Sequence, residues 1–177
     1  MNSRSLQVLA AAVMLGLPLG GMVFAAQDRN TLKVPDGLSF SEFKGYDAWQ
    51  PVAVSQTETG IKVIAANEVM MKAFRAGLPV DGKTFPEGSK IAKIEWERKP
   101  NPVSPYTVFV PGALKSLSFI EKDSRRFPNN HGWAYAQFTS DPATGELKPS
   151  VTGAECGYAC HTRVAAQDYI FTAYPPR

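Results

Sequence analysis

Alternating apolar and polar residues along the chain predict several short β-strands. The clearest alternation runs from Lys90 to Glu97 and is typical of a half-buried strand. Its two faces are expected to carry Ala92, Ile94 and Trp96 on one side, and Ile91, Lys93 and Glu95 on the other. Further strands are expected at residues 60–65, 106–110, 114–121 and 133–138, with turns at Pro111-Gly112 and at Asn129 to Gly132.

Two segments show helical spacing instead. Asn67 is placed to cap a helix from Glu68 to Arg75, and Gly77 to end it. The apolar face of that helix is expected to hold Val69, Met70, Ala73 and Phe74. Upstream, aromatic residues spaced three apart indicate a short helix packed into the core: Phe40, Phe43, Tyr46 and Trp49. Together these patterns predict an α+β fold, with a mainly antiparallel sheet and flanking short helices.

Composition narrows the class of protein. The chain has 177 residues, 44% of them hydrophobic and 20% charged, which is ordinary for one globular domain able to bury a core of its own. The net charge is only +3, and no block of five like charges occurs. The sequence therefore gives no argument for a nucleic-acid partner.

The N-terminus has the pattern of a secretory signal. Arg4 is followed by an apolar stretch to Phe24 and by small residues around Ala25. We expect residues 1–26 to be a cleaved signal peptide, with cleavage after Ala25 or Ala26, and residues 27–177 to form the mature domain. The expected location is periplasmic or secreted, with no membrane span after cleavage.

The chain's soft-ligand chemistry is concentrated near the C-terminus, where Cys156, Cys160 and His161 lie within six residues. A Cys-His pair with a second Cys upstream is similar to the C-x-x-C-H pattern of c-type haem attachment. Because an exported compartment is oxidising, we expect both thiols to have a use there. The local pattern leaves three uses open: thioether-bound haem, a Cys156–Cys160 disulfide, or a Cys/His metal site that His131 completes.

Three residues separate the cysteines, where the haem pattern has two. On a helix, the extra residue swings the first sulfur by about 100° around the axis and about 1.5 Å along it. Gly157 lies inside the spacer, and a one-residue bulge there would bring Cys156 back toward a vinyl group.

The segment from Cys160 to Tyr174 resembles the C-terminal signature of the cytochrome P460 family. In that signature a haem-binding Cys-His pair is followed by Asp, an aromatic residue, an apolar residue and Phe-Thr, here Asp168 to Thr172. The resemblance extends over about residues 45–174 and includes three further segments: Phe85 to Gly88 leading into Ile91-Ala92-Lys93, Phe119 to Phe127, and Gly132 to Tyr135.

The resemblance implies a periplasmic mono-haem c-type cytochrome, usually a homodimer, with a C-terminal haem-attachment segment. Cys160 and His161 correspond to the family's haem Cys and proximal iron ligand, and Cys156 is the candidate for a second thioether. The implied function is binding or oxidising hydroxylamine or nitric oxide, or electron transfer to a redox partner protein. The rival hypothesis is a haem-free exported module with a Cys156–Cys160 disulfide or a Cys/His metal site.

The resemblance implies that Lys93 would distinguish an enzyme from a gas binder. Members that oxidise hydroxylamine carry an additional Lys-to-haem bond, and Lys93 follows the matching segment Phe85 to Gly88. Glu95 on the same predicted strand is a candidate for moving protons. The alternative is a solvent-facing Lys93 paired with a neighbouring glutamate.

Overall fold

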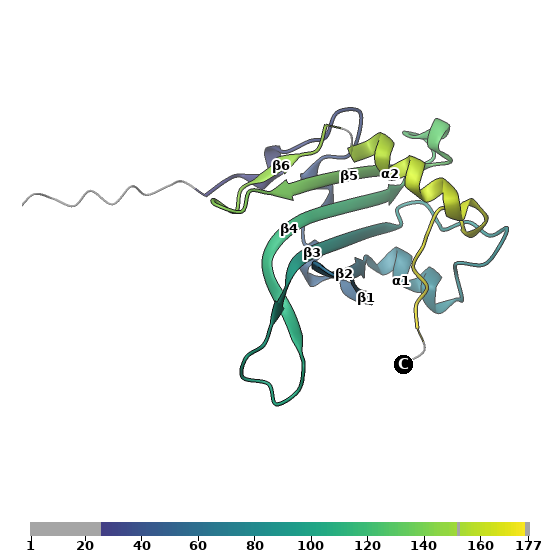
Figure 1. The fold of residues 1–177 in the computed structure, drawn as a ribbon. Helices are drawn as coiled ribbons and strands as arrows, with labels where there is room; N and C mark the ends of the chain where they lie inside the picture. Colours follow the sequence, from purple (N-terminus) through teal and green to yellow (C-terminus); the bar gives the residue numbers. More distant parts are fainter. Residues whose placement is uncertain (1–25, 152, 176–177) are drawn as a thin grey trace, which may run out of the picture.

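The structure, a computed structural model, describes residues 26–151 and 153–175. Its centre is one antiparallel sheet in which each strand pairs with the next along the chain (Figure 1). The strands are β1 (Gln50–Gln56), β2 (Gly60–Ala66), β3 (Lys90–Pro100), β4 (Phe109–Lys122), β5 (Trp133–Ser140) and β6 (Leu147–Pro149). The predicted α+β fold with a mainly antiparallel sheet is confirmed. The expected signal peptide lies, apart from Ala26, outside the described residues.

Two α-helices cover one face of this sheet: α1 (Glu68–Arg75) joins β2 to β3, and α2 (Gly153–His161) follows β6 (Figure 1). Short 3₁₀ turns occur at Arg29–Thr31, Phe40–Phe43, Tyr46–Ala48, Pro128–Asn130 and Thr162–Gln167. None of the helices in the two described ranges has the length and apolar character needed to cross a membrane.

Helix α1 has the predicted bounds but a shifted buried face. The Asn67 side chain accepts a hydrogen bond from the Met70 backbone N–H, as expected of a cap. The residues that pack inward are Met70, Met71, Ala73 and Phe74. Val69 is exposed, contrary to the prediction, because 100° per residue places it about 120° from the centre of that stripe.

The largest difference from the predicted secondary structure is in strand β4. Residues 106–110 and 114–121 were expected to be two strands separated by a turn at Pro111-Gly112, yet Pro111 lies inside β4 and pairs with Arg98. Strand β4 pairs with β5 only from Ser116 onward. At Pro111, therefore, the side of β4 that faces away from β3 has no partner strand among the described residues. A residue without an N–H is tolerated at such an edge. The far ends of β3 and β4 project from the body as a hairpin (Figure 1).

The N-terminal segment fills the sheet face opposite α1 and α2. Phe43 is fully buried and stacks on Phe119 of β4 with ring centroids 4.3 Å apart, while Phe40 packs edge-on against Phe119 and Phe138. The core assignment of the aromatic row is confirmed, although the backbone forms two 3₁₀ turns in place of one helix.

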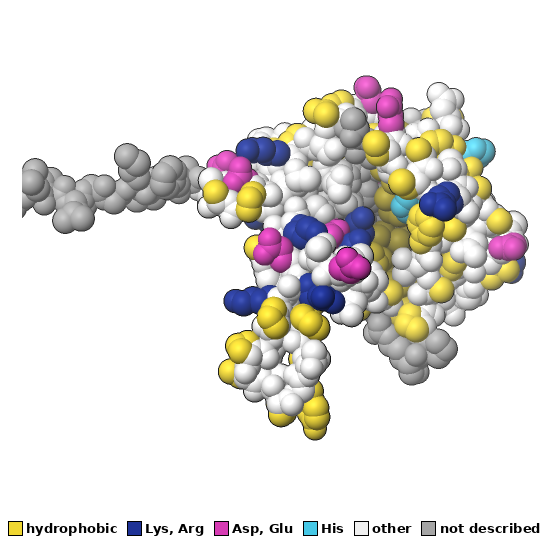
Figure 2. Space-filling view, viewed as in Figure 1, with side chains coloured by type: hydrophobic (Ala, Val, Ile, Leu, Met, Phe, Trp, Pro, Cys, Tyr) yellow, Lys and Arg dark blue, Asp and Glu magenta, His cyan; other side chains and the backbone are white. Residues whose placement is uncertain are grey.

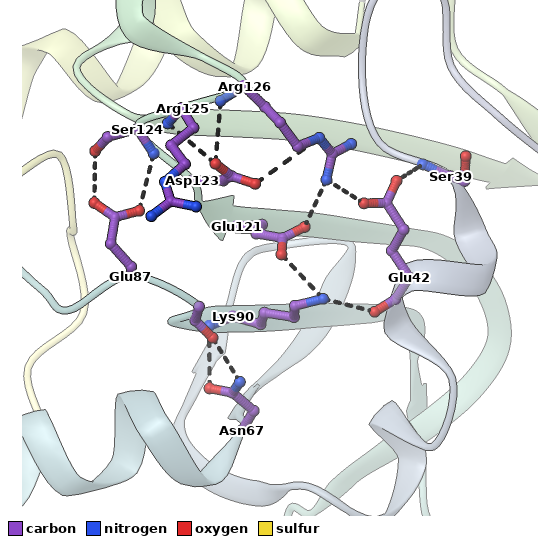
Figure 3. Close-up of polar contacts among 11 residues, drawn as sticks. Ser39, Glu42, Asn67, Glu87, Lys90, Glu121, Asp123, Ser124, Arg125 and Arg126 are labelled. Carbon is purple, nitrogen blue, oxygen red and sulfur yellow. Dashed lines mark hydrogen bonds and ion pairs between the residues drawn. The ribbon is translucent and has the colours of Figure 1, made fainter.

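An ionic cluster fastens that segment to the sheet (Figure 3). The Lys90 ammonium lies 3.1 Å from the Glu121 carboxylate and donates to the Glu42 carbonyl, and Arg126 reaches both Glu42 and Glu121. The Glu42 carboxylate also accepts from the Ser39 backbone N–H at the start of the turn. The charged contacts therefore join three segments that are far apart in the sequence.

Candidate functional site

A cavity of about 400 Å³ opens between the sheet and the C-terminal segment, and Figure 2 shows hydrophobic side chains gathered around the hollow beside it. Its floor is a row of paired residues across four neighbouring strands: Ile64, Lys93, Ser118 and Gln137. Helix α2 and the residues after it form the opposite wall, with Cys156, Gly157, Cys160, His161 and residues 170–172. A cavity of this volume is in the range of cofactor pockets.

Both cysteines line this cavity from one side of α2. The predicted bulge at Gly157 is wrong, because α2 runs as one helix from Gly153 to His161 and Gly157 is absent from the residues with positive φ. Cys156 and Cys160 are therefore one helical turn apart, and both thiols are free and exposed.

The glycine in the spacer serves packing. A Cβ on Gly157 would lie 2.7 Å from Cβ and 2.8 Å from Cγ of Tyr135 on β5, well inside van der Waals contact. A residue without a side chain therefore lets α2 approach the sheet closely and brings the cysteines over the cavity.

His161, the last residue of α2, is fixed by its ring contacts and one hydrogen bond. Its ring packs against Tyr135 and Phe171, with centroid distances of 4.9 and 5.0 Å. Nδ1 lies 2.5 Å from the Tyr169 carbonyl oxygen, so Nδ1–H is the donor and Nε2 carries the lone pair. Burial lowers the pKa of His161, which favours the neutral imidazole. A neutral ring with one nitrogen bonded to a backbone carbonyl is the usual state of a metal-ligating histidine.

Lys93 also faces the cavity from the middle of its floor. Burial lowers the pKa of this amine, and the charge of nearby Lys62 lowers it further, while Glu95 and Cys160 act in the opposite direction. The alternative of a solvent-facing Lys93 paired with a glutamate does not hold. Glu95 forms its ion pairs with Lys62 and Lys115, at 3.7 and 3.3 Å, and is absent from the cavity lining.

Two cavity-lining residues were not found from the sequence. The hydroxyls of Ser118 and Tyr135 are buried and have no hydrogen-bond partner among the described residues. Tyr135 is only 3% exposed, and burial raises the pKa of its phenol, so the hydroxyl stays protonated. Buried polar atoms of this kind normally have a partner, so these two hydroxyls are an unusual feature of the cavity wall.

The proposed Cys/His metal site does not form in the part of the chain that the structure describes. No three His, Cys, Asp or Glu side chains gather there in a way that would hold a metal ion. His131, which was expected to complete that site, stacks on Tyr169 with a centroid distance of 5.1 Å and lies outside the cavity lining.

The sequence matches the family Cytochrome P460 over residues 43–172, which is most of the chain and includes the cavity-lining strands and α2. The chain belongs to the cytochrome P460 family. A search of curated proteins found no match. Membership in a family of c-type haem proteins indicates a haem cofactor, and the family is typically periplasmic.

The residues around the cavity fit a haem on physical grounds. A neutral imidazole with a lone pair on Nε2, two thiols one helical turn apart and apolar walls are the groups that hold haem c.

Proposed function

We propose that the chain is an exported c-type cytochrome whose cavity holds haem bound covalently through Cys160 and Cys156, with His161 as the axial iron ligand. The observation that carries this proposal is His161: it is neutral, it lines the cavity, and its Nδ1 donates to the Tyr169 carbonyl. A bound haem supplies an iron centre that exchanges one electron and binds a small ligand.

The long cysteine spacer fits this proposal through the position of α2. Because Gly157 lets α2 lie directly on Tyr135, both thiols line the same cavity although they are four residues apart. Sulfur from each cysteine would add to one vinyl group, as in other c-type sites.

Covalent attachment is tested by expressing the protein in cells that mature c-type cytochromes and running it on a denaturing gel stained for haem. Wild type should retain haem after denaturation, and the double variant Cys156→Ala/Cys160→Ala should lose it. Each single variant should show the spectrum of a haem that keeps one vinyl group unreacted. A colourless wild-type protein with a Cys156–Cys160 disulfide would overturn the proposal in favour of the haem-free alternative.

A small molecule is the proposed ligand that a bound haem would take up, beside His161. Among the described residues that line the cavity, His161 is the one imidazole. Met70 and Met71 belong to α1, are buried in the core and do not line the cavity. We therefore propose that the chain binds or oxidises a small nitrogen compound, hydroxylamine or nitric oxide, or transfers electrons. The reduced protein should show a high-spin spectrum and bind nitric oxide or carbon monoxide, and a low-spin resting spectrum would argue for electron transfer alone.

Lys93 is the residue that we propose to separate these activities. Its lowered pKa increases the fraction of neutral, nucleophilic amine at the cavity floor. If Lys93 bonds to haem, the intact-protein mass and a shifted Soret band should report the link, and Lys93→Met should abolish both it and hydroxylamine oxidation. Lys115→Met is the matched control, because Lys115 pairs with Glu95 and lies outside the cavity lining. An unchanged spectrum in Lys93→Met would place the chain with the gas-binding or electron-transfer members.

Export, a redox partner protein and a homodimer belong to the same proposal. They rest on the apolar N-terminal sequence and on the family. Mass spectrometry of the native protein should find Ala26 or Gln27 at the N-terminus, whereas a mature chain beginning at Met1 would argue against cleavage. Light scattering of the purified protein should give twice the mass of one mature chain.

A further inference from the structure

A buried ion pair lies behind the candidate haem ligand. The Lys122 ammonium is 2.9 and 3.1 Å from the two carboxylate oxygens of Asp168, and both side chains are 5% exposed. Lys122 also donates to the His131 carbonyl. The carboxylate accepts two further hydrogen bonds, from Trp133 Nε1–H at 3.2 Å and from the Phe85 backbone N–H at 2.7 Å. The pair is thus fully hydrogen-bonded and joins three distant segments of the chain.

The backbone at this pair is held in a conformation that the sequence alone would not favour. Asp168 and Tyr169 are consecutive residues with φ of 48° and 65°, and neither is glycine. A non-glycine residue in this conformation is strained and persists where the surroundings impose it. The contacts of the Asp168 side chain provide that constraint, because they fix the first of the two residues to β4, β5 and the segment before β3.

The contacts of Asp168 affect the cavity through the peptide group of the next residue. Tyr169 directly follows Asp168, and its carbonyl oxygen is the acceptor for His161 Nδ1–H. If the turn at residues 168–169 relaxed, that oxygen would move away from the imidazole. Nδ1–H would then lose its acceptor, and the other tautomer, with the proton on Nε2, would become accessible.

We propose that Lys122 and Asp168 are positioning residues for His161. They hold the Tyr169 carbonyl where it fixes the tautomer and the ring orientation of the histidine, so that Nε2 keeps its lone pair toward the cavity. A hydrogen bond at the far nitrogen also raises the basicity of a ligating imidazole. The importance of this arrangement for iron rests on the proposed haem function, whereas the tautomer control does not.

A purely structural role makes a different prediction. Buried ion pairs often add little net stability, and breaking one by removing a single partner is destabilising whatever its purpose. Lower stability in a variant is therefore not informative by itself. The readouts that separate the two roles are the tautomer of His161 and the strength of its bond to iron.

Asp168→Asn is the sharpest single change. Asparagine accepts the left-handed backbone conformation and keeps an oxygen for the Phe85 or Trp133 donor, but it removes the charge that pairs with Lys122. Lys122→Met removes the other partner. Asp141→Asn is the matched control, because Asp141 forms a 3.0 Å ion pair with Lys148 that is more exposed and lies outside the cavity lining.

The full-length mature chain is measured as purified. In haem-loaded protein, resonance Raman of the reduced state should show the iron–histidine stretching band at lower frequency in Asp168→Asn and Lys122→Met. The affinity of His161 for the reduced iron should fall about 10-fold, the lower end of the usual effect of losing an outer hydrogen-bond partner. Asp141→Asn should match wild type in both measurements.

Nitrogen-15 NMR of His161 gives the second readout and does not require haem. The wild-type chain should show Nδ1–H, and the two variants should show a mixture of tautomers. A haem-free wild type with the Nδ1–H tautomer would overturn the proposed function and leave the positioning role intact. Folded Asp168→Asn protein with a wild-type tautomer and Raman band would overturn the positioning role.

Failure of the single variants to fold does not remove the test. The double variant Lys122→Met/Asp168→Asn leaves no unpaired buried charge. Trp133→Phe removes only the Nε1–H donor to Asp168 and should shift the tautomer ratio in the same direction by a smaller amount. A wild-type ratio in both of these proteins would also contradict the proposal.

Discussion

The two faces of the central sheet are built from the same strands, yet one is filled and the other is hollow. On the filled face, Phe43, Phe119 and Phe138 interlock and are all fully buried. The residues that directly precede Phe119 and Phe138, which are Ser118 and Gln137, face the other side and line a cavity of about 400 Å³. Since a strand turns successive side chains to opposite faces, one set of strands specifies both a stabilising core and a candidate binding site.

The segments that cover the two faces are also held differently. On the filled face, the N-terminal turn is fastened by the ionic cluster around Glu42, Lys90 and Arg126, in which Arg126 is partly exposed (Figure 3). On the hollow face, the segment after α2 is fastened by the fully buried pair of Lys122 and Asp168. The buried ion pair thus occurs on the side where the proposed function requires one side chain, His161, to keep a defined orientation.

The difference in packing between the two faces is tested most strongly by truncating one large side chain on each face to alanine. Phe43→Ala should lower the free energy of unfolding by about 3–5 kcal/mol, because it removes a fully buried ring from a packed core. Ile64→Ala on the cavity floor should cost about 2 kcal/mol or less, because Ile64 is only half-buried and already borders open space. Urea denaturation of each variant measures both values. Equal losses would mean that the cavity face is packed as tightly as the filled face.

Gly157→Ala is expected to have the next largest effect. The added methyl would collide with Tyr135, and α2 would have to move away from the sheet. We expect a loss of about 1–2 kcal/mol in the free energy of unfolding, although alanine is the better helix former by about 1 kcal/mol. Haem attachment should fall with it, since both cysteines would move. The matched control is Ala159→Ser at an exposed position of α2, and the idea fails if Gly157→Ala is as stable and as fully loaded as that control.

Patterns within a few residues were enough to predict much of the fold. Asn67 and Gly77 bound α1, and the alternation from Lys90 to Glu97 marks most of β3. Strand β1 was missed because it lies at the edge of the sheet, where Val52 is its one buried residue and the alternation is lost. Pro111 was misread because its tolerance depends on where β5 stops pairing with β4, which no local pattern reports.

The candidate site also contains residues that the sequence reveals and residues whose roles depend on distant segments. Cys156, Cys160 and His161 stand out in the sequence by residue type, and the structure places all three at one cavity. The role of Gly157 was misjudged, because the residue that requires a glycine there is Tyr135, which belongs to a different element. The position of Ser118 depends on strand register, and the contacts of Asp168 depend on segments brought together by folding, so residue type alone could not reveal either.

The smallest expected effect is a pH dependence that belongs to the hollow face alone. Burial lowers the pKa of His161 in the folded protein below its ordinary value of 6.5. The unfolded chain therefore takes up a proton at higher pH than the folded chain, and the stability that the neutral ring contributes is present above pH 6.5 and is lost as the pH falls below it. Urea denaturation of haem-free protein between about pH 7.5 and 5.5 should show this decline, and His161→Gln should flatten it. His131→Gln changes a histidine outside the cavity and should leave the decline in place. A decline that persists unchanged in His161→Gln would assign it to another group and would show that the imidazole is not held neutral by its burial.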